Sequence, residues 1–299
     1  MSTNTETLPQ NPPLPKFDSA NLQTLSGKLR ELYAYRYLLK NLVIRDLKVR
    51  YKNSFLGVIW SLLHPLLMMM VYTILFTILI PNEGVRDYPI FILVGLIPWQ
   101  FHTGTMNSGV HSITGNAAII KKVYFPRILL PTATLLSNLV NLLLASIVLL
   151  VLLFAFGVGL TIHTLWVPVI LLIQVIFLLG LTYFVATLQT FYRDTAMILE
   201  VGLLAWFFLT PVFYPFERFG TQSELFGIVF NPARLMRWLN PMASIIDGYR
   251  TVLWGTVNSN GPASMDPLPL LRTLVTAVLV FIIGYTVFSR SEHLFGEKL

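Results

Sequence analysis

The amino-acid sequence predicts an all-α integral membrane protein with six transmembrane helices. Two features of its composition support this prediction. Of the 299 residues, 55% are hydrophobic and only 12% are charged, which is about half the charged fraction of a typical soluble domain; the mean hydropathy is +0.68. The third feature is that the apolar residues are gathered into long runs, and a helix needs about 20 such residues to cross the hydrocarbon core of a bilayer.

Six runs are long enough to be such spans. They cover residues 55–80, 90–110, 135–156, 166–191, 196–213 and 268–288. Because the hydrocarbon core offers no water to backbone polar groups, each run is expected to be helical, with its glycines and prolines tolerated as kinks. Residues 53–290 therefore form the predicted transmembrane domain.

The distribution of Lys and Arg predicts how these spans are oriented. Most of the 21 Lys and Arg residues lie before the first span or in the segments that follow spans two, four and six. Since these residues favour the cytoplasmic side, we expect both termini in the cytoplasm. The net charge of +7 is explained by this asymmetry. Nucleic-acid binding is not expected, because the spans leave little surface for it.

Two segments precede the first span. Residues 1–28 are polar and contain several prolines, without the apolar core of a signal peptide, and they are predicted to be a disordered cytoplasmic tail. Residues 29–52 are predicted to form an amphipathic helix that lies in the cytoplasmic membrane interface. Its apolar face would carry Leu32, Tyr35, Leu39, Leu42, Val43 and Leu47, and its polar face Arg30, Asn41, Arg45, Lys48 and Lys52.

The basic face of this helix has two interpretations. It anchors the chain on anionic membrane lipids, or it steers an anionic, lipid-linked substrate toward a pore. The candidate head-group residues for the second role are Arg45, Lys48, Arg50 and Lys52.

Several motifs resemble those of a known family. They are RDLKVRYK at 45–52, SFLG at 54–57, Trp60 and Pro65; Asn116, Ile119, Ile120, Lys121, Lys122, Phe125-Pro126-Arg127 and Pro131; Tyr192-Arg193-Asp194; TPVFYP at 210–215; and Asn240-Pro241. In this order and at these positions relative to the spans, they resemble the permease subunit of polysaccharide and polyol-phosphate ABC exporters, the group that contains O-antigen and wall teichoic acid transporters. The resemblance covers nearly everything after the N-terminal tail.

This resemblance implies a function and a set of partners. A homodimer of the chain, together with two copies of an ABC ATPase subunit, would move a lipid-linked polysaccharide such as an O-antigen, a capsule or a teichoic-acid-like polymer across the bacterial inner membrane. The chain has no Gly-x-x-x-x-Gly-Lys-Ser/Thr phosphate loop. ATP and Mg²⁺ are therefore expected on the partner subunit, and no catalytic residue, cofactor or metal is expected in this chain.

Residues 116–127 are predicted to form a short cytoplasmic helix between spans two and three. Asn116 is expected to cap this helix and Pro126 to end it, which leaves apolar and basic side chains facing the cytoplasm. The resemblance implies that this is the coupling helix docked on the ATPase, with Phe125 as the largest anchor. Its candidate contact residues are Asn116, Ile119, Lys121, Lys122, Tyr124, Phe125 and Arg127. The alternative is an interfacial helix half sunk in lipid.

The segment 217–266, between spans five and six, contains two further helix starts. Asn231-Pro232 and Asn240-Pro241 each combine a capping residue with a proline in the first turn. The resemblance implies re-entrant external helices that close the pore, with Asp247 and Arg250 as candidate gating residues. The alternative is an amphipathic surface hairpin. Residues 291–299 are predicted to be a cytoplasmic tail.

Aromatic residues and one carboxylate complete the candidate transport path. Sugar rings stack on aromatic faces, and the candidate path residues are Tyr72, Phe76, Trp99, Phe177, Tyr183, Trp206 and Phe207. Packing is the alternative role for each of them. Glu200, inside the fifth run, either acts in gating or pairs with Arg193, seven residues earlier.

Three other function classes are less favoured by the sequence. A membrane-embedded glycosyltransferase or acyltransferase would need clustered carboxylates or histidines, but the five histidines are dispersed and have no metal-ligand spacing. An ion-coupled transporter would show paired broken helices in related halves, and no such repeat is visible. An ABC exporter permease for another amphipathic substrate remains the nearest alternative.

Overall fold

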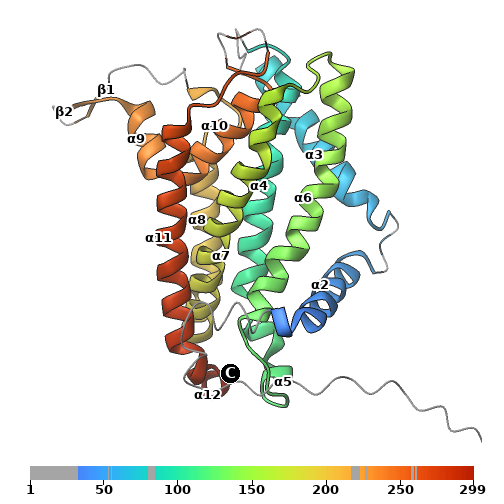
Figure 1. Cartoon of the computed structure of the whole chain (residues 1–299), viewed down its shortest axis with the longest axis vertical. Coiled ribbons are helices and arrows are strands. Elements are labelled where there is room, and N and C mark those ends of the chain that lie inside the picture. Colours follow the sequence, from blue (N-terminus) through green and yellow to red (C-terminus); the bar gives the residue numbers. More distant parts are fainter. Residues whose placement is uncertain are drawn as a thin grey trace, which may run out of the picture.

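The structure is a computed structural model that describes residues 33–52, 54, 56–79, 85–216, 223–225, 228–256, 259 and 261–299. The predicted tail 1–28, the start of the amphipathic helix and parts of the external segment 217–266 lie outside the described residues. Figure 1 shows a bundle of helices running roughly along the longest axis of the molecule.

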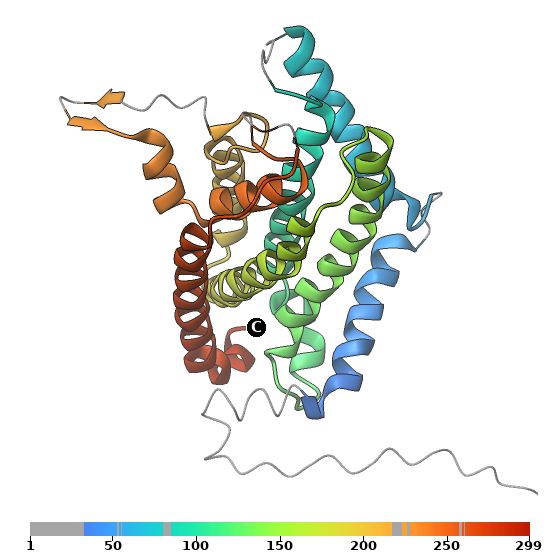
Figure 2. The ribbon, with the colours of Figure 1, turned by 45° about the horizontal axis from the view of Figure 1, so that its top comes forward.

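The main helices of the bundle follow the predicted apolar runs. They are α3 (Ile59–Ile74, continued by a π-helical turn, Leu75–Leu79), α4 (Tyr88–Val110), α6 (Leu129–Ala155), α7 (Val167–Phe191), α8 (Thr195–Leu209) and α11 (Pro267–Ser291). A separate helix, α2 (Arg36–Tyr51), occupies the predicted amphipathic segment. Figure 2 shows α2 lying beside α6, against which it packs.

Four helical stretches are long and apolar enough to cross a membrane, within the residues that the structure describes. They are Ile59–Ile78, Leu129–Ala155, Ile162–Phe191 and Pro267–Lys298. Helix α8 is apolar but has only 15 residues, and the second half of α4 is rich in polar side chains. The structure therefore supports a multi-pass membrane protein without establishing the predicted number of six spans.

Helix α4 forms the centre of the bundle. Most of its residues are buried, and it contacts α3, α6, α7, α8 and α10. Its first half, from Tyr88 to Trp99, supplies the largest share of the main apolar core. A helix that is covered on nearly all sides needs no lipid-facing apolar stripe, which explains why α4 tolerates polar residues in its second half.

Helices α7 and α11 pack most closely where two glycines meet. A Cβ atom added at Gly284 would overlap the carbonyl of Gly180, and one added at Gly180 would overlap the backbone of Phe281. Small residues at a helix crossing let two membrane helices approach along their backbones. This contact fixes the position of α11 against the rest of the bundle.

The described residues of the segment 217–266, which is predicted to be external, include two helices and a short β-hairpin. Helix α9 spans Pro232–Leu239 and helix α10 spans Pro241–Leu253; Asn231 and Asn240 cap them by accepting hydrogen bonds from Arg234 N and Ala243 N, at 2.9 and 3.2 Å. The predicted caps are thus confirmed. Strands β1 (Ser223–Leu225) and β2 (Ile228–Phe230) pair in antiparallel fashion. This hairpin was not predicted, because three-residue strands are too short to show an alternating pattern.

Helix α10 is not an amphipathic surface helix. Most of its residues are buried, and it packs on α4, α7 and α11, lying across the end of the bundle that is opposite α5 and α12 (Figure 1). Helix α9 keeps a strongly exposed side, with Leu235, Trp238 and Leu239 uncovered. The alternative prediction, that the segment 217–266 is an amphipathic hairpin on the surface, is therefore wrong for α10.

The last nine residues are not a simple tail. They form a 3-10 turn, Glu292–Leu294, and a short helix α12, Phe295–Lys298. The Phe295 side chain is fully buried, with its ring 5.2 Å from that of Phe288 on α11. The predicted tail 291–299 is thus folded, because Phe295 packs back onto the bundle, and its cytoplasmic location stays a prediction.

Candidate translocation groove and coupling surface

Two adjoining cavities form one groove on the bundle. The first is lined by Arg50, Tyr51, Trp60, Ser61, His64, Pro65, Ile97, Gln100, Phe101, Thr103, Gly104, Asn107, Asn138, Asn141, Leu142 and Ala145. The second is lined by His64, Met68, Tyr72, Leu96, Trp99, Gln100, Thr103, Asn107, Glu200, Leu203, Leu204 and Phe207. The first lies among α2, α3, α4 and α6, and the second among α3, α4 and α8. They meet at His64, Gln100, Thr103 and Asn107.

The wall shared by the two cavities is polar although the helices around it are apolar. Gln100, Thr103 and Asn107 follow one face of α4, and His64 approaches from α3. The amide nitrogen of Gln100 is buried and has no hydrogen-bond partner among the described residues. Polar groups at membrane depth are unfavourable against lipid and normally face a cavity or the interior of a bundle. This groove is therefore the surface of the bundle that suits a polar molecule.

Six of the seven predicted path aromatics belong to one network of ring contacts, and three of the six line this groove. The rings of Tyr72 and Trp99 lie 5.9 and 5.5 Å from that of Phe207. Phe76 joins them through Phe213, and Trp206 packs edge-on against Phe177, with ring centroids 6.2 Å apart. Tyr72, Trp99 and Phe207 line the groove, but Trp99 is only 4% exposed, so Tyr72 and Phe207 are the ones that offer ring surface.

Phe177 and Tyr183, two of the predicted path residues, do not line the groove. Phe177 is 2% exposed and packs inside the main core. Tyr183 is equally buried in a separate apolar cluster, where its hydroxyl shares a hydrogen bond of 2.9 Å with Thr132. A residue buried in this way has no surface to offer a passing sugar. The sequence pattern did not distinguish these rings because α7 is apolar on all sides.

The two ends of the groove carry opposite charges. Arg50 lines the first cavity, and Glu200, which is exposed, lines the second. Within the part of the chain that the structure describes, Glu200 makes no ion pair with Arg193. The pairing alternative for Glu200 is thus not observed, and Glu200 is an exposed residue that lines the second cavity.

The other predicted head-group residues of α2 differ in their surroundings. Arg45 is engaged within the protein: it pairs with Asp46 at 2.8 Å and donates to Asn116 Oδ1 at 2.8 Å. Lys48 and Lys52 are exposed. Only Arg50, among the four predicted residues, reaches the cavity.

The predicted coupling helix is much shorter than 116–127. A 3-10 turn, Thr114–Asn116, leads into α5 (Ala117–Ile120), and the chain leaves the helix at Lys121. Pro126 and the residue before it disfavour helical geometry. Asn116 does not cap α5 with its side chain; instead it donates to the Ser112 carbonyl at 2.8 Å and accepts from Arg45. The capping prediction for this residue is wrong.

The exposed surface of this segment is carried by different residues from those expected. Tyr124 is 92% exposed, and Ile119, Val123, Lys121 and Lys122 are also exposed. Phe125, in contrast, is only 8% exposed. The prediction that Phe125 anchors a partner is wrong, because this ring already packs within the chain.

Phe125 belongs to a second apolar cluster, at the same end of the molecule as the C-terminus. This cluster also contains Leu42 of α2, Ile120 of α5, Phe288 of α11 and Phe295 of α12. Elements from three separate regions of the sequence thus meet in the cluster that contains Phe125.

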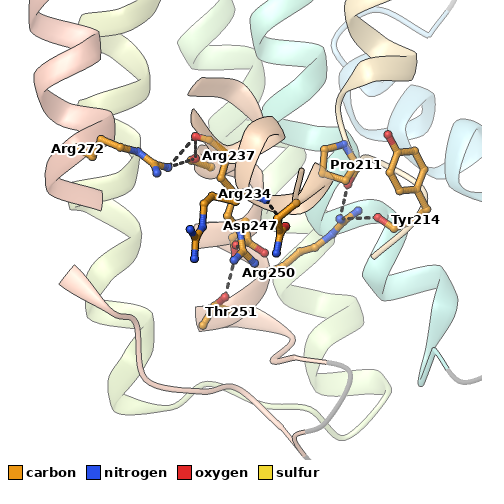
Figure 3. A network of polar contacts seen from close by, with 10 residues as sticks. Pro211, Tyr214, Arg234, Arg237, Asp247, Arg250, Thr251 and Arg272 are labelled. Carbon is orange, nitrogen blue, oxygen red and sulfur yellow. Dashed lines mark hydrogen bonds and ion pairs between the residues drawn. The ribbon is translucent and has the colours of Figure 1, made fainter. Parts of the chain in front are cut away.

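The two predicted gating residues form part of a polar network at the other end (Figure 3). Arg250 is buried and donates to the carbonyls of Pro211 and Val212, and its guanidinium lies 3.7 Å from the ring centroid of Phe91. Asp247 pairs with Arg237 of α9 at 3.3 Å. These contacts tie α10 to α4, to α9 and to the chain that follows α8.

Sequence reasoning missed the polar side chains that α4 and α6 contribute to the groove. Asn138 and Asn141 interrupt the apolar run of α6 three residues apart, so they lie on one side of the helix. Both line the first cavity. This spacing was a detectable signal.

The sequence-based prediction also missed the role of Asn240. Its Oδ1 accepts a hydrogen bond of 2.8 Å from the indole nitrogen of Trp206, which joins α8 to α10.

The described residues contain no group of three His, Asp or Glu side chains that would hold a metal ion. This observation provides no support for a metal-dependent glycosyltransferase site in that part of the chain.

Comparison with known proteins agrees with the membrane architecture. Residues 37–254 match the family described as ABC-2 type transporter. The chain is 35% identical, over 271 residues, to the O-antigen export system permease protein RfbA of Myxococcus xanthus. The aligned region covers 91% of this chain and 98% of that protein. It is 31% identical to an O-antigen export system permease protein RfbA of Klebsiella pneumoniae, over 89% of this chain and 98% of that protein. The chain therefore belongs to the ABC-2 type transporter family.

Proposed function

We propose that the chain is the transmembrane subunit of an ATP-driven exporter that moves a lipid-linked polysaccharide of the O-antigen type across the bacterial inner membrane. The relatives named as O-antigen export permeases align along almost their whole length. The observation that carries the proposal is the groove, since its amide, hydroxyl and aromatic lining lies among apolar helices and matches the chemistry of sugars. Sugar hydroxyls hydrogen-bond to the polar side chains, and sugar rings stack on the aromatic faces.

A homodimer completes the path in this proposal. Helix α8 borders the groove, and its residues Met197, Val201 and Leu204 are strongly exposed. Glu200 lies on this same exposed side, and a carboxylate is costly against lipid. A second copy that faces α8 would enclose the groove and shield Glu200 from the hydrocarbon.

The energy comes from a separate ABC ATPase subunit, two copies of which bind the dimer and hold ATP and Mg²⁺. The surface proposed to meet it is formed by Ile119, Lys121, Lys122, Val123 and Tyr124. An exposed aromatic flanked by basic side chains is typical of an interface anchor. The packed cluster behind this surface supports its role in transmitting movement, with Arg127 as part of its support.

The proposed orientation places both termini in the cytoplasm. Residues 119–124 and the C-terminus lie at one end of the bundle and α9 and α10 at the other (Figure 1), which agrees with the distribution of Lys and Arg. In this orientation α9, α10 and the Arg250 network close the external end of the path. The exposed Lys48 and Lys52 would contact lipid head groups on the cytoplasmic side.

Deleting the gene and restoring it tests the proposal. Cells without the chain are expected to accumulate lipid-linked polysaccharide on the cytoplasmic side and to lose the polymer from the surface. Expression of the chain together with an ABC ATPase should restore the surface polymer, and expression of the chain without any ATPase should not. Normal surface polymer in the deleted strain would rule the proposal out.

A further inference from the structure

The charges in the groove are arranged so that its two halves suit different parts of one molecule. Among the described residues that line the first cavity, Arg50 is the only one with a permanent charge, and no carboxylate lines that cavity. Among those that line the second, Glu200 is the only one with a permanent charge. Between them the shared wall is neutral apart from the titratable His64.

The guanidinium of Arg50 is held by neutral groups. Its Nη2 atom donates to Asn138 Oδ1 at 3.1 Å and reaches Ser108 Oγ at 3.5 Å. Asn138 is fixed in turn by its own bond of 2.8 Å to the Thr134 carbonyl. No described carboxylate pairs with Arg50. A guanidinium has five N–H donors, so these contacts orient Arg50 while leaving its charge uncompensated.

Further hydrogen-bonding groups surround this charge. Tyr51, the next residue on α2, donates to Asn141 Oδ1 at 2.5 Å, and both residues line the cavity. Ser61 at the start of α3 and the unpartnered amide of Gln100 complete the polar lining. Arg50 is exposed, so a ligand can reach it, and a guanidinium whose N–H groups are not taken by a carboxylate is suited to binding phosphate oxygens.

We propose that the cavity around Arg50 binds the phosphate-containing head group of the lipid-linked substrate, while the part of the groove beside Glu200 receives uncharged sugars. This inference rests on the proposed function and assigns the charged part of its substrate to one place. The carboxylate of Glu200 repels phosphate and accepts hydrogen bonds from sugar hydroxyls. The head group is thus retained at Arg50, and the sugars next to it extend toward Tyr72 and Phe207, which line the second cavity and are only partly buried.

Binding of a small prenyl diphosphate measures this directly and does not depend on export. The full-length chain, reconstituted in nanodiscs of phosphatidylcholine, is titrated with radiolabelled farnesyl diphosphate. Unlabelled farnesol, inorganic pyrophosphate and phosphatidylglycerol serve as competitors. Arg50→Gln removes the charge, Arg50→Lys retains it, and Lys48→Gln is the matched control, because Lys48 is exposed on the same helix and does not line the cavity.

The expected result is that Arg50→Gln weakens farnesyl diphosphate binding about tenfold to a hundredfold, the range for charge-assisted hydrogen bonds. Arg50→Lys should weaken it less, and Lys48→Gln should leave it unchanged. Farnesol should compete poorly. A variant that removes charge from the other end, Glu200→Gln, should not weaken binding of the diphosphate, since its carboxylate opposes the ligand.

Several outcomes would overturn the inference. One is equal affinity of the wild type and a folded Arg50→Gln variant; another is equal competition by farnesol. If phosphatidylglycerol competes as well as farnesyl diphosphate, the occupant is an ordinary phospholipid and the assignment to substrate fails. Equal competition by inorganic pyrophosphate supports a phosphate site and assigns no role to the prenyl chain. Each of these failures leaves the export test above unaffected, so the two proposals are judged separately.

Discussion

Arg127 and Glu292 join the segment after α5 to the C-terminal end of α11, although they are 165 residues apart in the sequence. The backbone N–H of Arg127 donates to Glu292 Oε1 at 3.1 Å, and its guanidinium donates to the Glu292 carbonyl. This link lies beside the buried rings of Phe125 and Phe295. The exposed surface around Tyr124 is therefore supported from behind by the end of the chain.

Replacing Tyr124 and Phe125 by alanine is expected to give different defects. Tyr124→Ala removes an exposed ring and should weaken copurification of the ATPase by more than about tenfold, as for an interface anchor worth about 2 kcal/mol. Phe125→Ala removes a buried ring and should lower stability by about 3–5 kcal/mol. Copurification and thermal unfolding, measured at matched permease abundance, distinguish the two. Wild-type ATPase binding by Tyr124→Ala would show that this surface lies on lipid.

The C-terminal segment is expected to contribute to stability. Phe295→Ala should lower the free energy of unfolding by about 3 kcal/mol or more, because the ring is fully buried and its loss leaves a cavity. Lys298→Ala, on the exposed side of α12, is the control and should change little. Thermal unfolding in detergent checks both variants. Equal melting temperatures would mean that this segment does not pack as described.

The crossing of α7 and α11 is expected to tolerate no side chain at Gly284. Gly284→Ala places a methyl group against the Gly180 carbonyl and should destabilise the chain by about 1–3 kcal/mol, the usual cost of overpacking. Gly202→Ala makes the same chemical change on α8, where an added Cβ meets nothing within 4 Å. The measurement is the melting temperature of each purified variant. A stable Gly284→Ala variant beside a destabilised Gly202→Ala variant would contradict this packing.

The orientation of the chain is open to a clean labelling experiment because the sequence contains no cysteine. Single cysteines at Lys121 and Leu299 should be protected from a membrane-impermeant thiol reagent added to intact spheroplasts. Cysteines at Arg86 and Ser259 should react with it, since the loops that contain them are expected to be external. Protection at Ser259 together with reaction at Leu299 would reverse the orientation.

The sequence predicted the local features of the fold better than the contacts between distant segments. The ends of α4, α7 and α11 all lie within three residues of the ends of the predicted apolar runs. Helix α8 stops at Leu209 rather than at 213, because Pro211 and the residue before it disfavour helix. This shortening leaves a helix of 15 residues, which the hydropathy of the run did not show.

The candidate site was predicted only in part, for a related reason. The sequence predicted Arg50 and Phe125 as site residues, but the pattern around each did not show which side chain is buried. Arg50 is exposed and Phe125 is buried. Phe125 is buried by α11 and α12, more than 160 residues later in the chain, and such long-range packing leaves no periodic signal around position 125. The amides of α6 were overlooked because their apolar neighbours dominate the average hydropathy of that run.

The central claim is that the groove between α3, α4 and α8 carries the polysaccharide, and polymer export by a variant with a blocked groove tests it most directly. Thr103→Trp would fill the wall shared by the two cavities, and Val151→Trp adds the same ring on the exposed side of α6. Surface polymer is measured in membranes matched for permease abundance and for ATPase copurification. We predict that Thr103→Trp abolishes export while Val151→Trp retains it. Wild-type export by a folded Thr103→Trp variant would contradict the account.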